Sequence, residues 1–557
     1  MDQAEKPAVT AKPPDGASKL EQSVKPPSSI RSATASPDPA SSMEASPLRD
    51  HLSHTGIEYD EPAPAEDRVD DDEVDNEEYD TDASEDESEQ EDSDEDDAQR
   101  EQLRRRQHEG KVNFPQCPEM SQLPPRLTKK SKYVKENPKR DNIFMYLLAS
   151  IVVVFRKIKL EDFGLSFPKP SDDDDKLTLK NIVDTFSELK DDTFKVPNFL
   201  TDQKQRIKFK HLIARINKGG KEGFNCLDCE VTKKPRLNSQ VNIPTIVNGH
   251  SMVAQLKDVL NKRLSKVSDM LKKSGNTTML QSLNNEKAEL NDVLRKLPSY
   301  EKFFIYSMEK SFTNLHVDFG GTFVYYYVME GTKVFWIAPP TKENLEVYKR
   351  LESRGQDIWT HEKEFLMSNF ERHELHAGDL AFIPSGYLHF VYTPAKSLVF
   401  GGNFLHQNKL KQHFEITRFE EECNVKAEKY KLFWDVQFAF VKYVFMNDIK
   451  THFQFGGSIL PQSCLETGKL FLDELQKEVK TEKGGIYTSE EKAQILKELQ
   501  AALKKGTPRG KRNYSEPTEE STPLTIKDIE SMEALQESKS QSTSTPSSSN
   551  SKRARVK

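Results

Sequence analysis

The segment at residues 303–404 constrains the fold most, because it contains many short apolar runs separated by turn residues. In order, these runs are FFIYSM, NLHVDF, TFVYYYVM, KVFWIAP, DLAFIP, FVYT and SLVFGG. Each has the length of a strand, and glycine, proline or other turn residues separate them. This pattern predicts an all-β sandwich or barrel at the centre of the chain.

Two short motifs in this segment contain candidate metal ligands. His316 and Asp318 stand two residues apart, so their side chains would project from the same face of a strand. His389 ends the second motif, IPSGYLH. Two histidines and one carboxylate are the ligands of the facial triad that binds Fe(II) and leaves positions open for a co-substrate and oxygen. The HVD motif alone is a weak signal, because a histidine and an aspartate on a strand are more often ordinary surface or hydrogen-bonded residues.

The residues around both motifs resemble the JmjC lysine demethylases across roughly residues 300–410. The similar segments, in matching order and spacing, are HVDFGGT, KVFWIAPPTKENL and GDLAFIPSGYLHFVYTPAKSLVFGGNFLH. The segments GGT and FWIAPPT are most similar to the branch that acts on histone H3 lysine 36, the JmjC domain-containing histone demethylation protein 1 type. The resemblance implies an α+β fold, the double-stranded β-helix of the JmjC and cupin jelly roll, with flanking helical regions and long disordered tails.

The same resemblance implies a metal centre and a co-substrate site. His316, Asp318 and His389 would hold Fe(II), and Thr313 and Lys333 would bind 2-oxoglutarate. The apolar neighbours of Lys333 disfavour the alternative that it is a surface lysine on a strand. The implied enzyme is a dioxygenase that demethylates histone lysines, with histone H3 lysine 36 as the implied site. It would hydroxylate an N-methyl group and release formaldehyde and succinate.

Three further residues receive roles from the resemblance, and the chain departs from the family in two segments. Tyr326 and Asn225 would line the substrate pocket, and Asn403 would support the metal ligands from behind. Relatives have a tyrosine where this chain has Phe303, and they have WYH where this chain has YYY. A neighbour such as Tyr306 is one replacement for the missing hydroxyl. These departures leave two alternatives open: a JmjC hydroxylase acting on a non-histone protein, and a catalytically silent chromatin scaffold.

Composition predicts that much of the chain lies outside any core. Only 35% of the 557 residues are hydrophobic, 31% are charged, and the mean hydropathy is −0.75. We expect residues 1–122 to be a disordered acidic tail, since like-charged runs such as EDESEQEDSDEDD stay solvated. We expect residues 507–557 to be a disordered, basic tail rich in serine and threonine. The net charge of −9 describes mainly the first tail.

Four regions are expected between the tails. Residues 123–141 would be a basic linker, for which a solvated connection and a nuclear address or nucleic-acid contact remain equal alternatives. The others are an N-terminal mixed α/β region at 142–250, the JmjC catalytic domain at 251–420 and a C-terminal helical region at 421–506. Periodicity predicts a helix after an N-cap at Ser251, and a terminal helix that begins with a Thr488–Glu491 capping box. Residues 274–297 look like an insertion relative to the family.

Cysteine usage and apolar run lengths exclude other classes. Five cysteines are few and scattered, which fits a reducing compartment. Cys226 and Cys229 form a single CxxC, whereas a structural zinc site needs four ligands, so we expect neither structural zinc nor a PHD or CXXC zinc module. The apolar run at 143–155 is shorter than the roughly twenty residues that span a bilayer, so we expect a buried segment and no membrane anchor.

The resemblance and the charged tails together predict partners and location. The partner implied by the family is the histone H3 tail within a nucleosome. Without zinc modules, any further chromatin complexes would form through the charged tails. The clusters KKGTPRGKR and KRARVK are consistent with nuclear import.

Overall fold

The computed structural model describes residues 118–170, 176–200, 203–220, 223–274, 276–422, 429–480, 484–507 and 525–542, the last of these without the side chains from residue 535 onward. The disorder predicted for 1–117, 508–524 and 543–557 falls outside the described residues. So do the acidic run and the terminal cluster KRARVK.

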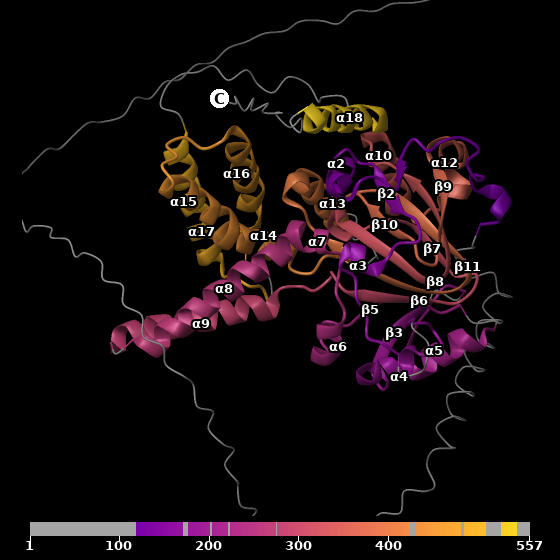
Figure 1. The fold of residues 1–557 in the computed structure, drawn as a ribbon, viewed down its shortest axis with the longest axis horizontal. Helices are drawn as coiled ribbons and strands as arrows, with labels where there is room; N and C mark the ends of the chain where they lie inside the picture. The colour runs from indigo at the N-terminus through magenta and orange to yellow at the C-terminus, as the bar shows by residue number, and fades with distance from the viewer. Residues whose placement is uncertain are drawn as a thin grey trace, which may run out of the picture. The chain divides into compact units, whose positions relative to one another are not determined.

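The described part of the chain contains a nine-stranded sheet with the order β1-β2-β10-β8-β11-β6-β5, in which β7 also pairs with β11 and β9 with β8 (Figure 1). Only β1 and β2 are parallel among these pairs. The strands are β1 Val134–Glu136, β2 Val152–Phe155, β5 Asn225–Glu230, β6 Phe303–Ser307, β7 Phe312–Val317, β8 Phe323–Ala338, β9 Glu371–His376, β10 Leu380–Ile383 and β11 Leu388–Phe404. A separate hairpin pairs β3 Thr193–Asn198 with β4 Gln203–Lys208.

Strands β8 and β11 run through both layers of the barrel. The first half of β8 pairs with β10 and with the second half of β11, whereas its second half pairs with β9 and with the first half of β11. Gly331 lies between the two halves with φ +82°, and a Cβ there would lie 2.3 Å from the carbonyl oxygen of Lys396. The opposite part of β11 shifts register between Tyr392 and Leu398. This crossing confirms the predicted double-stranded β-helix.

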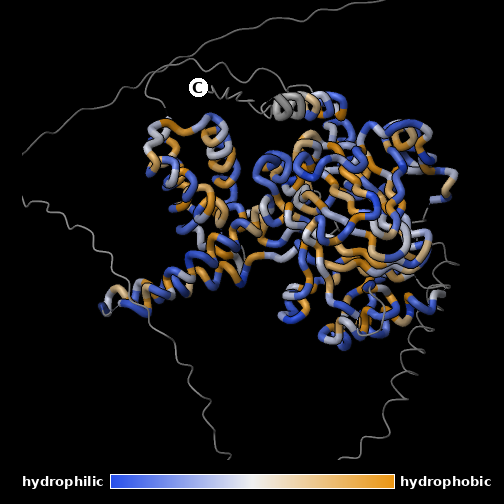
Figure 2. Tube along the Cα trace, in the orientation of Figure 1, coloured by the Kyte–Doolittle hydropathy of each residue, from blue (hydrophilic) through white to orange (hydrophobic). Residues whose placement is uncertain are grey.

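Side chains alternate between the barrel interior and the outer face of β8. Tyr326 packs in the cluster that includes Val324 from its own strand half and Phe335 from the other. Tyr325 and Tyr327 instead join the core shared with the N-terminal region. Period-two alternation along a strand explains this division. Figure 2 shows the apolar residues concentrated along the strands of the sheet.

The helices fall into three groups along the chain. Those of the N-terminal region are α2 Ile143–Leu148, α3 Leu160–Phe163, α4 Ile182–Thr185, α5 Phe209–Lys218, α6 Pro235–Gln240 and α7 Thr245–His250. Those inserted between β8 and β9 are α10 Lys342–Arg354, α11 Ile358–His361 and α12 Lys363–Asn369. The remaining helices are α8 Met252–Lys273, α9 Thr277–Lys296, α13 Leu410–Glu422, α14 Phe433–Phe440, the π-helix η6 Val441–Phe445, α15 Met446–Gln454, α16 Gln462–Leu475, α17 Ser489–Gly506 and α18 Ile526–Ser542.

Both predicted helix starts are confirmed by hydrogen bonds. The Ser251 hydroxyl accepts the amide hydrogen of Ala254 at the start of α8. At the start of α17, Thr488 accepts the amide hydrogen of Glu491, whose carboxylate in turn accepts that of Thr488. The buried side chains of α8 and α9 belong to the same apolar cluster as those of α14–α17. The predicted domain boundary at 250/251 therefore cuts across the packing, since 252–297 packs with the C-terminal helices.

The prediction of a linker at 123–141 is wrong, because this segment packs on the barrel. Leu123 is 2% exposed, and Trp336 donates its indole hydrogen to the carbonyl of Pro124 over 2.8 Å. Val134 begins β1, the edge strand beside β2. A few apolar residues spaced among the lysines are enough to anchor the segment, although its composition is that of a linker.

The C-terminal segment and the apolar run at 143–155 complete the fold. Helix α18 lies within 507–557, where the sequence predicts a disordered tail, because Ile526 and Ile529 are buried in the core that includes α2. The run at 143–155 forms α2 and β2, and most of its side chains are buried, as expected. None of the helices in the described ranges has the length and apolarity needed to cross a bilayer.

Candidate functional site

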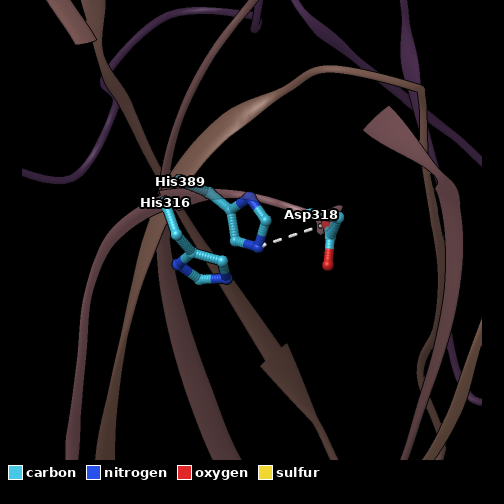
Figure 3. Close-up of side chains that lie close together, drawn as sticks. All are labelled: His316, Asp318 and His389. Atoms are coloured by element: carbon cyan, nitrogen blue, oxygen red, sulfur yellow. Dashed lines mark ion pairs between the residues drawn. The ribbon is translucent and has the colours of Figure 1, made fainter. Parts of the chain in front are cut away.

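The three predicted metal ligands come together at one end of the barrel (Figure 3). His316 lies near the end of β7 and pairs in register with His389 near the start of β11. Asp318 follows immediately, before the turn η4 Phe319–Gly321. The two imidazole rings have centroids 4.2 Å apart, and Nε2 of His389 lies 3.8 Å from Oδ2 of Asp318. The candidate ligand atoms of all three side chains lie within 4.8 Å of one another.

Backbone carbonyls orient both histidines toward the same point. Nδ1 of His316 lies 2.8 Å from the carbonyl oxygen of Asn314, and Nδ1 of His389 lies 3.2 Å from that of Tyr387. If each Nδ1 donates its hydrogen there, each Nε2 keeps a free lone pair. Burial, reinforced by the neighbouring His316, lowers the pKa of His389 to about 4. A neutral imidazole is the form that binds a metal, so this donor set fits a metal-binding site.

Asn403 hydrogen-bonds the carboxylate of Asp318, the candidate carboxylate ligand. Its Nδ2 donates to Oδ1 of Asp318 over 3.1 Å and to the Thr322 hydroxyl over 2.8 Å. Asn403 lies on β11 and is 3% exposed. A buried amide in this position restricts the rotation of the carboxylate, which is the role that the sequence predicts for it.

Lys333 lies deep in the barrel, away from solvent. Its side chain is 2% exposed, and Nζ donates to the hydroxyls of Ser307 over 2.7 Å and Thr393 over 2.8 Å. Both partners are neutral, and no carboxylate in the described part of the chain pairs with the ammonium group. Burial therefore lowers the pKa of Lys333 to about 7. A buried cation with only hydroxyl partners is suited to an anionic ligand.

A hydrogen-bonded chain joins Lys333 to Thr313. The Ser307 hydroxyl that accepts from Lys333 donates to Oδ1 of Asn225 over 2.7 Å. Nδ2 of Asn225 donates to the Thr313 hydroxyl over 3.1 Å. The sequence predicts Asn225 in the substrate pocket, and the structure places it in contact with Thr313 and links it to Lys333 through Ser307.

Sequence reasoning missed Ser307 and Thr393, although a signal for both was present. Thr393 stands four residues after His389 on β11, so period-two alternation directs it to the same face. Ser307 likewise shares a face of β6 with Ile305, which packs in the barrel interior. Hydroxyl residues at such positions are available to a buried ammonium group.

Phe303 and Tyr326 lie on the interior side of their strands. Tyr326 is 7% exposed and meets Phe335 edge to face, with ring centroids 5.2 Å apart. Phe303 packs against the same interior cluster. Tyr306, considered as a replacement for the missing hydroxyl, lies on the opposite face of β6 beside Cys229. That suggestion is therefore wrong, because residues three apart on a strand face opposite sides.

The CxxC motif is not part of the group formed by the candidate metal ligands and lies in β5. Cys226 and Cys229 are 1% and 0% exposed and pack in the apolar core shared with the N-terminal region. Burial raises the pKa of the Cys226 thiol to about 12, which disfavours the thiolate form that binds metals.

Comparison with known proteins identifies relatives that are similar to part of this chain. No family model matches the chain. Lysine-specific demethylase 2A of Xenopus tropicalis is 34% identical over 176 residues, or 30% of this chain and 15% of that protein. JmjC domain-containing histone demethylation protein 1 of Saccharomyces cerevisiae is 41% identical over 146 residues, or 26% of this chain and 29% of that protein. The protein of the same name in Caenorhabditis elegans is 33% identical over 231 residues, or 41% of this chain and 19% of that protein. The chain thus spans less than a third of the length of each of these relatives.

Proposed function

We propose that this chain is a JmjC histone demethylase, an Fe(II)- and 2-oxoglutarate-dependent dioxygenase that removes N-methyl groups from histone lysines. Relatives named for histone demethylation and lysine-specific demethylation support the reaction. Histone H3 lysine 36 is the proposed site because the GGT and FWIAPPT segments resemble the branch that acts there. The observation that supports this proposal most is the shared barrel interior. The group His316–Asp318–His389 and the buried Lys333 lie in it together.

The polar residues of the barrel interior are proposed to bind the metal and the co-substrate. His316, Asp318 and His389 would hold Fe(II). Lys333 with a charge and Thr313 with a hydroxyl would both bind the carboxylate of 2-oxoglutarate that lies far from the metal. When bound, these groups together with oxygen supply the oxidising power that hydroxylates an N-methyl group, releasing formaldehyde, succinate and carbon dioxide. The protein orients the reactants and excludes bulk water.

The substrate end of the proposed site is aromatic. Tyr326 is buried on the face shared with the metal ligands, and burial keeps its hydroxyl protonated by raising its pKa. An aromatic face attracts a methylated ammonium group through cation–π interaction. We therefore propose Tyr326 as a wall of the methyl-lysine pocket. The proposed partner is the histone H3 tail in the nucleosome, the proposed location is the nucleus, and further chromatin contacts are assigned to the charged tails.

Methylated histone H3 peptides, incubated with the purified full chain, Fe(II) and 2-oxoglutarate, test this function directly. We expect mass spectrometry to show stepwise loss of methyl groups and an equal release of formaldehyde. The variants His316→Ala, Asp318→Ala and His389→Ala should abolish turnover without unfolding the protein, because each leaves too few ligands. His376→Ala, an exposed histidine of β9, is the matched control and should retain turnover.

Two outcomes would contradict parts of this proposal. Full formaldehyde release by any triad variant would overturn the metal assignment. Metal and 2-oxoglutarate binding without demethylation of any histone peptide would favour a JmjC hydroxylase, whereas absence of co-substrate binding would favour a silent scaffold.

A further inference from the structure

The turn that follows Asp318 has an unusual backbone conformation. Gly320 and Gly321 both have positive φ, +61° and +58°. A Cβ on Gly321 would lie 2.6 Å from Cδ1 of Ile416 on α13, and one on Gly320 would lie 3.2 Å from Cβ of Tyr430. Two consecutive left-handed residues without side chains let the chain reverse closely over α13. The backbone of this turn therefore depends on the helix beneath it.

Two buried side chains of α13 hold both polar groups of the Gly320 backbone. Both carboxylate oxygens of Glu420 accept the amide hydrogen of Gly320, over 2.9 and 3.0 Å. Nδ1 of His413 lies 3.1 Å from the carbonyl oxygen of the same glycine. Because Nε2 of His413 accepts the amide hydrogen of His406 over 3.1 Å, Nδ1 carries the hydrogen and donates it. Gly320 is thus fixed from both sides, two residues beyond a metal ligand.

Glu420 is a buried acidic residue that hydrogen-bonds to this turn. Glu420 is 6% exposed, and its hydrogen bonds to other described residues go to Gly320. Burying a carboxylate is costly when no cation pairs with it closely. A residue buried in this way near the candidate metal ligands is a candidate for a functional role.

Helix α13 also contacts the turn that precedes His389. Ser385, in the turn before His389, donates its hydroxyl hydrogen to the carbonyl of Gly321. A Cβ on the next residue, Gly386, would lie 3.1 Å from Cδ1 of Ile416, the side chain that also supports Gly321. Helix α13 is therefore the common support of the turns that carry Asp318 and His389.

We propose that His413 and Glu420 are positioning residues that set the separation of Asp318 from His389, and with it the metal affinity. This inference rests on the metal centre of the proposed function, and it assigns the centre a dependence on the helix that follows the barrel. Neither residue touches the metal position. Both act through the backbone of Gly320. Partners of metal ligands typically change metal affinity ten- to a hundredfold when they are removed.

Metal affinity of the purified full chain is the readout, measured by calorimetric titration with Co(II) in the absence of 2-oxoglutarate and peptide. Glu420→Met keeps the length of the side chain and removes the hydrogen-bond acceptor. It should weaken Co(II) binding by about tenfold or more. Glu420→Gln keeps an oxygen acceptor for the Gly320 amide and should recover affinity to within about threefold of the wild type.

Glu421→Met is the matched control for the loss of a glutamate from α13. Glu421 accepts the indole hydrogen of Trp434 over 2.7 Å, so its loss disturbs helix packing without reaching the turn. We expect this variant to lower the melting temperature while leaving Co(II) affinity within about twofold of the wild type. Equal Co(II) affinities for Glu420→Met and Glu421→Met would overturn the proposal.

A second pair of variants decides the matter if Glu420→Met does not fold. His413→Asn retains a donor near the Nδ1 position for the Gly320 carbonyl, whereas His413→Gln places its amide near the Nε2 position. The proposal predicts that Asn preserves Co(II) affinity better than Gln, and equal or reversed affinities would contradict it. These titrations measure metal binding alone. Failure of demethylation with a normal Co(II) ranking would count against the proposed function only.

Discussion

Lys333 is the residue at which burial and charge conflict most. Its ammonium group has two neutral hydroxyl partners and a pKa lowered to about 7. The carboxylate of a bound 2-oxoglutarate would provide the missing negative charge. That carboxylate stabilises the charged form of the lysine, so binding should be accompanied by proton uptake above neutral pH.

Removal of Lys333 should affect the co-substrate far more than the peptide. A buried charged hydrogen bond contributes roughly 1.5–3 kcal/mol, so Lys333→Ala should raise the 2-oxoglutarate requirement about ten- to a hundredfold. The peptide requirement should change little. Steady-state titration of each substrate at saturating levels of the other measures the two effects. An unchanged 2-oxoglutarate requirement would mean that other groups hold its carboxylate.

The lowered pKa of Lys333 also predicts the direction of a pH effect. The free protein holds Lys333 protonated below about pH 7 and increasingly neutral above it. The apparent dissociation constant of 2-oxoglutarate should therefore rise from pH 7 to pH 9, by at most about tenfold per pH unit. Calorimetry with a redox-inert divalent metal measures this constant. Lys333→Met, which removes the titrating group, should abolish the slope, and a slope that persists in this variant would assign the effect elsewhere.

Phe303 occupies the position at which the family has a tyrosine. Its ring carbons would come within 3.4–3.6 Å of a Cβ on Gly401, so the ring lies closely against β11. Phe303→Tyr should tighten 2-oxoglutarate binding up to about tenfold, because one restored hydrogen bond contributes roughly 0.5–1.5 kcal/mol. Co-substrate titration beside a thermal melt tests this expectation. Unchanged binding with a lower melting temperature would show that the added hydroxyl is buried without a partner.

The clustering of the candidate metal ligands could be predicted from the sequence because their positions follow from local motifs. His316 and Asp318 are neighbours in the chain, and a β-strand fixes their common face. The partners of Lys333 were not predicted, because Ser307 and Thr393 meet it only through the register of three different strands. Motifs describe neighbours in sequence, whereas such contacts depend on strand pairing.

Strand boundaries show the same limit at the scale of elements. The sequence predicts a turn between two strands at the residues EGT around Gly331, but β8 continues through them, and β11 shifts register opposite. The run FVYT and the run SLVFGG likewise merge into β11. Strand β9, with the sequence ERHELH, was missed because polar residues dominate it and pairing with β8 alone defines it.

Helix starts were predicted accurately because capping is a local interaction. Thr488→Ala removes the hydroxyl that accepts the Glu491 amide at the start of α17. The loss should lower the free energy of unfolding by about 1 kcal/mol, within the usual range of 0.5–2 kcal/mol for such caps. Urea denaturation monitored by circular dichroism measures the change. Lys497→Ala, an exposed substitution in the same helix, should be nearly neutral, and an equal loss in both variants would contradict a capping role.

At the scale of the whole molecule, composition misassigned two segments that the fold uses. The basic segment at 123–141 and the helix at 526–542 each have few apolar residues, and average hydropathy treats both as solvated. In the structure they meet, since Glu530 pairs with Lys135 over 2.6 Å and with Lys130 over 3.4 Å. Nothing within either segment alone reveals a contact between residues about four hundred positions apart.

Apolar burial, rather than charge, should hold α18 against α2. Ile529 is 1% exposed in a core that includes Tyr146, whereas partly exposed ion pairs such as Glu530–Lys135 contribute only about 0.2–1 kcal/mol each. Ile529→Asp should therefore undock the helix, because it places a charge in an apolar core. Hydrogen exchange should then become fast in α18 and faster in α2, while Co(II) affinity stays unchanged because neither helix contacts the metal ligands.

Met532→Asp provides the control for this last change. Met532 lies one turn further along α18 and is 43% exposed, so its replacement adds the same charge at little cost in burial. We expect exchange in α18 to stay near that of the wild type. If both variants leave α18 protected, the contact does not depend on Ile529. If both release it, the negative charge rather than the lost apolar contact controls docking, and the ion pairs of Glu530 would be the dominant attachment.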